Sequence, residues 1–320
     1  ISYEKEKLMK AIGVMKHGGP EVLEVIDLPE MKAGPGQIRI RNFAAAVNPV
    51  DVSVRNGSMA AIQAANPPPY VPGMDAAGIV DQVGEGVETD LKEGDEVMAM
   101  VVPSGSYGAY MEYIVLDQNA VVKVPEDTSY VQASTLPMNS LTARLSLDLL
   151  GLKEGQVLAV TGGPGAYGGY VIQLAKAEGL IVLADSSPSD EELLKSWGVD
   201  VIIPRGDGFV ERVRTEFPKG VDGIADGALL NESAIDALTD GGSFTSVRGF
   251  KGEPQREIKF TTTWVTAYDC QKEKLEDLRQ KVEDGILSLR VADTVDINNA
   301  SEAHKRLEAG GTRGRMVIEF

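Results

Sequence analysis

The segment that most constrains the fold is an apolar run that leads through three glycines into a helix-like stretch. The apolar run covers 157–160, and the apolar helical pattern covers 170–178. A turn that lets a pyrophosphate approach the backbone needs residues without a Cβ, and the start of the next helix offers N–H groups and a positive dipole end. We therefore expect a dinucleotide to bind here. The residues expected at its phosphates are Gly162, Gly165, Ala166, Tyr167 and Gly168.

The region around these glycines alternates short apolar runs with helical stretches. The expected strands are at 157–160, 180–183, 199–203 and 221–225. The expected helices are at 170–178, 190–197, 209–217 and 233–238. Strand and helix at this spacing predict an α/β fold with a doubly wound parallel sheet, of the Rossmann type.

The residues on either side of this region predict a β-rich domain, because short strand-like runs are separated there by Gly, Pro and Asp turns. The runs are at 37–41, 78–83, 96–102 and 110–115. The C-terminal region holds helical stretches at 271–284 and 301–309, then a strand at 316–320 that could return to the first domain. For 320 residues we expect two domains. They are a discontinuous one, 1–129 with 268–320, and an inserted cofactor domain, 130–267.

The charge of the chain bears on its partners. Asp and Glu number 48 against 31 Lys and Arg, and the net charge is −17. Such a field repels nucleic acid and anionic membrane surfaces, so we expect neither as a partner and interpret the charge as favouring solubility. No apolar run approaches the roughly 18 residues of a membrane span, and residues 1–7 are charged, unlike a signal sequence. A cytoplasmic protein is the expectation.

The chain has few residues that bind metals tightly. It holds one cysteine, Cys270, and two histidines, His17 in a glycine-rich turn and His304 in the last helical stretch. A catalytic zinc site typically uses three protein ligands and a structural one four. We therefore expect no metal and no intrachain disulfide, and we interpret both histidines as surface or structural residues.

The preference for NAD or NADP stays open on the residues alone. Asp185 ends the strand after the glycines, where a carboxylate can accept hydrogen bonds from the adenosine ribose and favours NAD. Ser186 and Ser187 could instead donate to a 2′-phosphate. The positive charge that this phosphate requires could come from three arginines. These are Arg205, Arg313 and Arg315.

Nearly the whole chain resembles the zinc-independent medium-chain dehydrogenases and reductases, in their quinone oxidoreductase and enoyl reductase group. The matching segments, in order, are 48–57, 72–80, 84–87, 94–97, 105–113, 136–137, 141–143, 303–304 and 310–317. The resemblance implies a GroES-like β-rich catalytic domain beside the cofactor domain, NADP(H) as coenzyme, and a homodimer or homotetramer. In zinc enzymes of the wider superfamily a Cys lies near the position of Asn48 and a His-Glu pair near Met74 and Asp75.

The resemblance also implies roles for residues of the first domain. Asn48 is expected beside the nicotinamide or the substrate, with Asp51 and Arg55 supporting the cleft and close enough in sequence to pair on a helical turn. Ser53 stands where some relatives carry a tyrosine thought to act on the substrate. Alternative proton donors are Tyr107, Tyr110 or water, and Thr142 is a candidate contact to the nicotinamide amide.

These expectations lead to one function and two alternatives. The chain is expected to reduce quinones, or the C=C bond of α,β-unsaturated carbonyl compounds, with NAD(P)H. The first alternative is an enoyl-thioester reductase of a biosynthetic pathway, and the second is a non-catalytic NAD(P)H-binding sensor that kept the fold.

Overall fold

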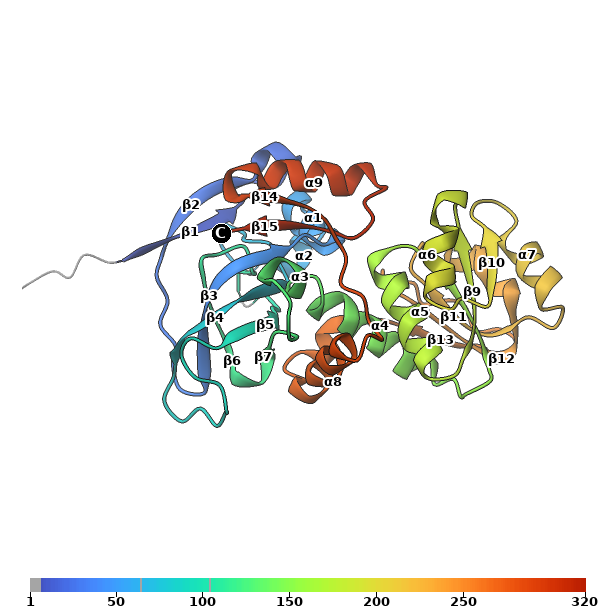
Figure 1. Ribbon diagram of the computed structural model, residues 1–320. Helices are drawn as coiled ribbons and strands as arrows, with labels where there is room; N and C mark the ends of the chain where they lie inside the picture. Colours follow the sequence, from blue (N-terminus) through green and yellow to red (C-terminus); the bar gives the residue numbers. More distant parts are fainter. Residues whose placement is uncertain (1–6, 64, 104) are drawn as a thin grey trace, which may run out of the picture. The chain divides into compact units, whose positions relative to one another are not determined.

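The computed structural model describes residues 7–63, 65–103 and 105–320 (Figure 1). Contacts between Cα atoms divide the chain into two compact units. The first unit comprises Ile1–Met138, Asp269–Glu283 and Leu289–Phe320, and the second comprises Asn139–Tyr268 and Asp284–Ser288. The interpretation of residues 1–7 as lacking a signal sequence falls almost wholly outside the described residues. No helix within the described ranges is long and apolar enough to cross a membrane.

The first unit is built on β-sheets. Its strands are β1 (Leu8–Gly13), β2 (Glu24–Pro29), β3 (Gln37–Ala46), β4 (Asp75–Val83), β5 (Glu96–Met100), β6 (Tyr113–Asp117), β7 (Val121–Lys123), β14 (Val291–Asp296) and β15 (Arg315–Glu319). Strands β1 and β2 pair with each other, and the larger sheet has the order β14-β15-β3-β4-β5-β7 with β6 also on β3. All these pairs are antiparallel except β14 with β15. The terminal strand thus returns to the first unit, where Val317 pairs with Ala46.

Short helices surround this sheet. They are α1 (Pro49–Asn56), α2 (Ala60–Gln63), α3 (Tyr130–Ala133), α8 (Lys272–Glu283) and α9 (Ala300–Ala309), with 3-10 turns η1 (Pro20–Val22), η2 (Gln118–Ala120) and η6 (Ile297–Asn299). Helix α1 begins at a proline, whose fixed φ suits the first helical position, and ends at Gly57 with φ +87°. Helix α9 buries Ala300, Ala303 and His304, which share one face at helical spacing.

The second unit contains one fully parallel sheet. Its strands are β8 (Val157–Thr161), β9 (Ile181–Ser186), β10 (Val201–Pro204), β11 (Val221–Asp226), β12 (Leu238–Ser246) and β13 (Lys259–Thr262), in the order β10-β9-β8-β11-β12-β13. Each neighbouring pair is parallel. The connections are α5 (Ala166–Ala177), α6 (Glu191–Ser196) and α7 (Phe209–Glu216), with η3 (Pro188–Asp190), η4 (Asn231–Ala237) and η5 (Val265–Tyr268). The expected α/β fold class is confirmed.

The sequence pattern misses two strands of this sheet. Strands β12 and β13 were not expected, and 233–238 was expected as a helix, whereas a 3-10 turn ends at Ala237 and β12 begins at Leu238. The pairing of β12 with β11 changes register between Val221 and Gly223. This irregularity, next to Gly241 and Gly242, interrupts the alternation by which a strand is detected.

The two units differ from the expected domain bounds in the segments 130–138 and 284–288, and by the single residue Tyr268. The first of these segments packs on the first unit, where the ring of Tyr130 stacks on Phe43 at 5.1 Å and its hydroxyl donates to Glu96 at 2.8 Å. The second segment belongs to the second unit, where the Ser288 amide donates to Gln173. Helix α4 (Pro137–Leu150) contains the boundary, which explains why no turn signal marks it.

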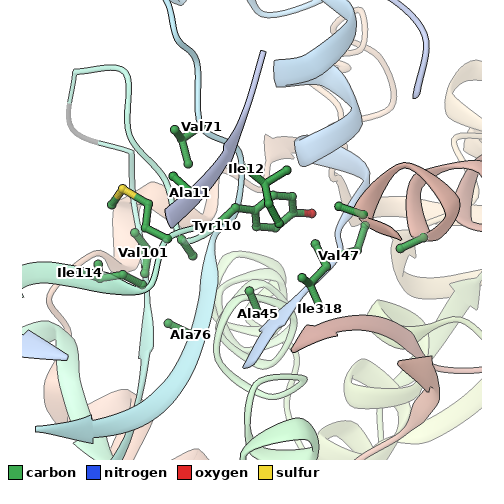
Figure 2. Packing of buried hydrophobic residues seen from close by; sticks show 14 of the residues in the cluster. Ala11, Ile12, Ala45, Val47, Val71, Ala76, Val101, Tyr110, Ile114 and Ile318 are labelled. Carbon is green, nitrogen blue, oxygen red and sulfur yellow. The ribbon is translucent and has the colours of Figure 1, made fainter. Parts of the chain in front are cut away.

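A large apolar cluster of the first unit surrounds Tyr110 and includes Met9, Ala11 and Ile12 of β1 (Figure 2). The Tyr110 ring lies among apolar side chains such as Ile12, Val71 and Val47, and its hydroxyl oxygen points away from Val101 and Ile114. Because Tyr110 is fully buried, its hydroxyl needs a partner inside the protein. This buried hydroxyl belongs to the polar network described below.

Candidate active and coenzyme site

The glycine turn joins β8 to α5 in the second unit. Gly162 has φ +70°, a left-handed conformation that favours glycine, and its carbonyl accepts a hydrogen bond from the Gly165 amide at 2.9 Å. Gly165 is the N-cap of α5 and makes no side-chain cap, so the first N–H groups of the helix have no intrahelical partner. A Cβ added at Gly168 would lie 2.3 Å from the Gly162 carbonyl oxygen. Only glycine therefore allows the helix to pack this close to the turn.

Asp185, near the carboxyl end of β9, stabilises this turn through hydrogen bonds to its backbone. One carboxylate oxygen accepts hydrogen bonds from the amides of Gly162 at 2.7 Å and Gly163 at 3.1 Å. The other oxygen lies 3.3 Å from Nε of Arg205. The side chain is almost fully buried, so its carboxylate stabilises the turn in addition to any contact with a ribose.

Ser186 and Ser187, whose hydroxyl groups were expected to contact a 2′-phosphate, form hydrogen bonds within their own loop. Ser186 donates to the Ser187 carbonyl at 2.7 Å, and the Ser187 hydroxyl donates to Asp190 at 2.6 Å. Of the three candidate arginines, Arg205 lies in the second unit beside Asp185, while Arg313 and Arg315 belong to the first unit.

Tyr167 and Thr142 are linked by hydrogen bonds through α4. The Tyr167 hydroxyl donates to Ser146 at 2.8 Å, and the Ser146 hydroxyl donates to the Thr142 carbonyl at 3.0 Å. Burial raises the pKa of the Tyr167 hydroxyl, the Ser146 hydrogen bond lowers it, and the charge of Asp226 raises it. The phenol is therefore neutral, and its hydroxyl proton is directed to Ser146.

In the first unit, Asn48 and Asp51 form the start of α1. The Asn48 backbone amide donates to the Asp51 carboxylate at 2.7 Å, so the third helical residue satisfies the N-cap amide. The other carboxylate oxygen accepts from the Gly73 amide at 3.1 Å. Asn48 and Asp51 are both fully buried. Burial raises the pKa of Asp51 from 3.8 to about 6, although these hydrogen bonds and that from Tyr110 lower it.

Asp75, the first residue of β4, holds the side chain of Asn48. One carboxylate oxygen accepts from Nδ2 of Asn48 at 2.7 Å, and the other accepts from the backbone amide of Met138, at the start of α4, also at 2.7 Å. Burial raises the pKa of Asp75 to about 7, while these two hydrogen bonds lower it, and the charge of Asp51 adds to the increase. The two buried carboxyl groups therefore interact electrostatically, and burial favours the protonated form of each.

A second set of contacts connects Asp51 to α9. The Tyr110 hydroxyl lies 3.1 Å from the Asp51 carboxylate and 3.1 Å from Nε2 of His304. Nη1 of Arg55 lies 3.1 Å from Nδ1 of His304, and the same guanidinium forms a two-pronged hydrogen bond with Glu308 at 3.0 and 2.8 Å. Burial, with a contribution from the charge of Arg55, lowers the pKa of His304 from 6.5 to about 3. His304 is therefore a neutral, buried imidazole.

Two interpretations of these residues from the sequence were wrong, and a third was right in part. Asp51 and Arg55 do not pair, because the guanidinium is directed to Glu308 and His304 while Asp51 accepts from backbone amides and Tyr110. For His304, expected as a surface or structural residue, full burial excludes the surface role and agrees with the structural one. Tyr110 lies outside any strand, in the segment before β6.

The remaining predicted residues lie as follows. Ser53 is buried in α1, with its hydroxyl 3.4 Å from the Pro49 carbonyl of its own helix. Arg315 is buried at the start of β15, and its charge lowers the pKa of both Asp51 and Asp75. The structure thus brings Arg315 into the same electrostatic environment as the two carboxyl groups, whereas Arg313 is exposed.

Sequence reasoning missed three members of this network. Asp75 was considered only because zinc enzymes carry a His-Glu pair near its position. Neither His304 nor Glu308 was assigned to the site. One signal was present for His304, since Ala300, Ala303 and His304 recur at helical spacing and place the imidazole on the buried face of α9. No local signal exists for its contacts, which join residues 194 and 249 positions apart in the chain.

The comparisons with known proteins agree with this architecture. Residues 34–126 match the family described as alcohol dehydrogenase GroES-like domain, and 197–318 match the one described as zinc-binding dehydrogenase. The chain is 31% identical to a 2-methylene-furan-3-one reductase of Solanum lycopersicum, over 97% of this chain and 79% of the relative. It is 29% identical to a quinone oxidoreductase of Sus scrofa, over 98% of both chains. A solved quinone oxidoreductase of Coxiella burnetii has a TM-score of 0.87 at 29% identity, over 98% of this chain and 100% of that one.

Proposed function

Because this chain belongs to the quinone oxidoreductase and enoyl reductase group of the medium-chain dehydrogenases and reductases, we propose that it reduces quinones or α,β-unsaturated carbonyl compounds with NAD(P)H. Both classes of substrate accept a hydride at a carbon conjugated to a carbonyl group. The similarity to named reductases over almost the whole chain is the observation that carries the proposal. We also propose that the substrate is a small molecule and that the chain assembles as a homodimer or homotetramer. Light scattering tests the assembly.

The residues of the glycine turn fit a dinucleotide. The turn has no side chain at three positions, it leads into an uncapped helix start, and a Cβ at Gly168 would push the turn and α5 apart. We propose that the backbone of Gly162, Gly165, Ala166, Tyr167 and Gly168 holds the pyrophosphate. The bound coenzyme would supply the hydride.

We propose that the reaction proceeds without zinc. Within the described ranges no group of three or more His, Cys, Asp or Glu side chains is arranged to hold a metal ion. Both ring nitrogens of His304 lie within hydrogen-bond distance of other side chains, Nδ1 with Arg55 and Nε2 with Tyr110. Near the position where zinc enzymes carry a cysteine ligand, this chain has Asn48, whose side-chain amide is oriented by Asp75. Asn48 is the residue that we propose to lie beside the reacting atoms.

Asp185 supports a preference for NADH. A 2′-phosphate near this carboxylate would be repelled, and the adjacent Arg205 offsets only part of that repulsion because its side chain is 44% exposed. We therefore propose that the chain favours NADH and that Asp185 sets the preference.

Replacing Asp185 with serine is expected to raise the ratio of kcat/KM for NADPH to kcat/KM for NADH by about tenfold, or about 1.4 kcal/mol. The variant also loses support for the glycine turn, but that loss affects both coenzymes and cancels in the ratio. Asp200→Ser is the matched control, because Asp200 accepts from the Val182 amide at the opposite end of β9. An Asp185→Ser ratio equal to that of the wild type would exclude Asp185 as the specificity residue.

The proposed function is tested by following oxidation of NADH and NADPH with a panel of quinones, enones and saturated ketones in the presence of EDTA. We expect turnover with a quinone or an enone, little with the saturated ketones, and no loss on adding the chelator. Tight coenzyme binding without turnover on any member of the panel would contradict the proposal and favour the non-catalytic sensor.

A further inference from the structure

The buried contacts between α9 and α1 allow only one direction of hydrogen bonding. A guanidinium nitrogen can only donate, so Nη1 of Arg55 donates to Nδ1 of His304. Since His304 is neutral, its proton then lies on Nε2, which donates to the Tyr110 oxygen. The single proton of the Tyr110 hydroxyl is left to point at Asp51. Every link of the chain therefore donates towards the Asp51 carboxylate.

This direction has two consequences for the site. Tyr110 cannot supply a proton to a substrate, because it is fully buried and its proton is held by Asp51. Asp51 receives the hydrogen bonds of Asn48, Gly73 and Tyr110, all of which donate, and such a set stabilises the ionised carboxyl group more than the protonated one.

We propose that His304 and Tyr110 are positioning residues that keep Asp51 ionised and thereby fix the start of α1, which carries Asn48. This inference rests on the proposed function in one respect, which is that Asn48 lies beside the reacting atoms. The Asp51 carboxylate ties the Asn48 backbone to Gly73, while Asp75 holds the Asn48 side chain. The backbone of Asn48 is thus held by Asp51 and its side chain by Asp75. The contact with Asp51 depends on α9, because His304 of that helix orients the Tyr110 hydroxyl.

The charges around Asp51 agree with this role. Asp75 on β4 is a neighbouring carboxyl group whose pKa burial also raises, and the charge of Arg315 on β15 lowers the pKa of Asp51. Arg55 is the cation at the other end of the chain, and its charge is shared with Glu308. With a pKa of about 6, Asp51 is mostly ionised at pH 7 to 8, the form that its three donated hydrogen bonds favour.

The first test is the tautomer of His304, measured by two-bond ¹H–¹⁵N NMR on the full chain labelled in histidine. The chain contains two histidines, so a His17→Gln variant assigns both sets of signals. We expect His304 to be the neutral Nε2–H tautomer and to stay so at pH 5, below its ordinary pKa of 6.5. A proton on Nδ1 or an imidazolium at pH 7 would overturn the proposal. This readout is independent of turnover, so its failure is distinguishable from failure of the proposed function.

The second test compares Tyr110→Phe with the wild type. The variant loses one hydrogen bond to a charged group, and we expect the pKa of Asp51, followed by ¹³C NMR of its carboxyl carbon, to rise by about one unit. The acidic limb of the kcat/KM profile should move to higher pH by the same amount, with KM less affected than kcat. An Asp51 pKa equal to that of the wild type would overturn the proposal, whatever the activity.

Two substitutions of His304 distinguish positioning from packing. Gln can offer an amide N–H to Tyr110 and a carbonyl oxygen to Arg55, whereas Leu fills similar space and offers neither. We expect His304→Gln to keep the wild-type carboxyl pKa and pH profile, and His304→Leu to shift both in the direction of Tyr110→Phe. Equal behaviour of the two variants would show that α9 acts by packing alone and would overturn the proposal.

Discussion

Replacing Asp51 with alanine is expected to lower the free energy of unfolding of the first unit by about 3 kcal/mol at pH 8. The substitution leaves the Asn48 amide, the Gly73 amide and the Tyr110 hydroxyl without their acceptor. Each buried group without its acceptor costs about 1–3 kcal/mol. The variant also escapes the burial cost that raises the pKa of Asp51 from 3.8 to about 6, which offsets about 3 kcal/mol.

The pH dependence of this effect has a defined sign. Because the folded pKa of Asp51 lies above its unfolded value, the folded state binds the extra proton, and the wild type loses stability as the pH rises from about 4 to about 6. Asp51→Ala lacks this loss, so the difference between the two proteins is larger at pH 4 than at pH 8. A difference that grows with pH would contradict the raised pKa.

Hydrogen exchange followed by mass spectrometry on peptides from β3 and β4 measures the unfolding of the first unit directly. Asp27→Ala is the matched control, because Asp27 pairs with Lys10 on the surface of the same unit and its side chain is 50% exposed. We expect the control to change stability by less than about 1 kcal/mol. If Asp51→Ala behaves like this control, the buried network does not contribute to the stability of the first unit.

Gly168→Ala is expected to raise the coenzyme Kd at least about a hundredfold, or about 2.7 kcal/mol, and to destabilise the second unit by about 2 kcal/mol. The new Cβ would meet the carbonyl oxygen of Gly162 at 2.3 Å and that of Gly163 at 2.9 Å. These are backbone atoms of the turn, so the turn and α5 must move apart. Coenzyme titration gives the Kd, and urea unfolding followed by tryptophan fluorescence gives the stability, since Trp197 and Trp264 both lie in the second unit.

Gly165→Ala separates the two effects. Its φ of −67° suits any residue, and an added Cβ would lie 3.1 Å from the Gly162 carbonyl oxygen, a contact that a small shift of the turn relieves. The second unit should therefore lose less stability than in Gly168→Ala. Coenzyme binding should nevertheless weaken, because the Cβ is added at the helix start proposed to face the pyrophosphate. Normal coenzyme binding by Gly168→Ala would show that the glycine turn is not the binding site.

The second unit was predictable because its signals are local. A strand of about five residues, three glycines and an apolar helix occupy one short segment, and each glycine has a reason in that segment alone. Strand β12 was missed because a register change and neighbouring glycines break the alternation of its side chains. Strand β13, of only four residues, was missed as well. The first domain boundary was expected at 129/130 but lies within α4, at Met138. It could not be found from the sequence because a continuous helix contains no turn residues that would mark a boundary.

The candidate site was predictable only in part. Asn48, Asp51 and Arg55 were selected from a short segment, but the direction of each side chain depends on residues far away in sequence. Arg55 could have met Asp51 one helical turn earlier, and it meets Glu308 because α9 packs beside α1. His304 required the return of the C-terminal chain to the first unit, and sequence spacing does not encode that contact.

The most direct test of the account is transfer of deuterium from NADH or NADPH labelled at the C4 position of the nicotinamide to an enone, in the presence of EDTA. Hydride transfer without a metal predicts that one of the two labelled epimers delivers deuterium to the β-carbon of the product, with unchanged yield when the chelator is added. A product without deuterium from either epimer, or turnover that the chelator abolishes, would contradict the account.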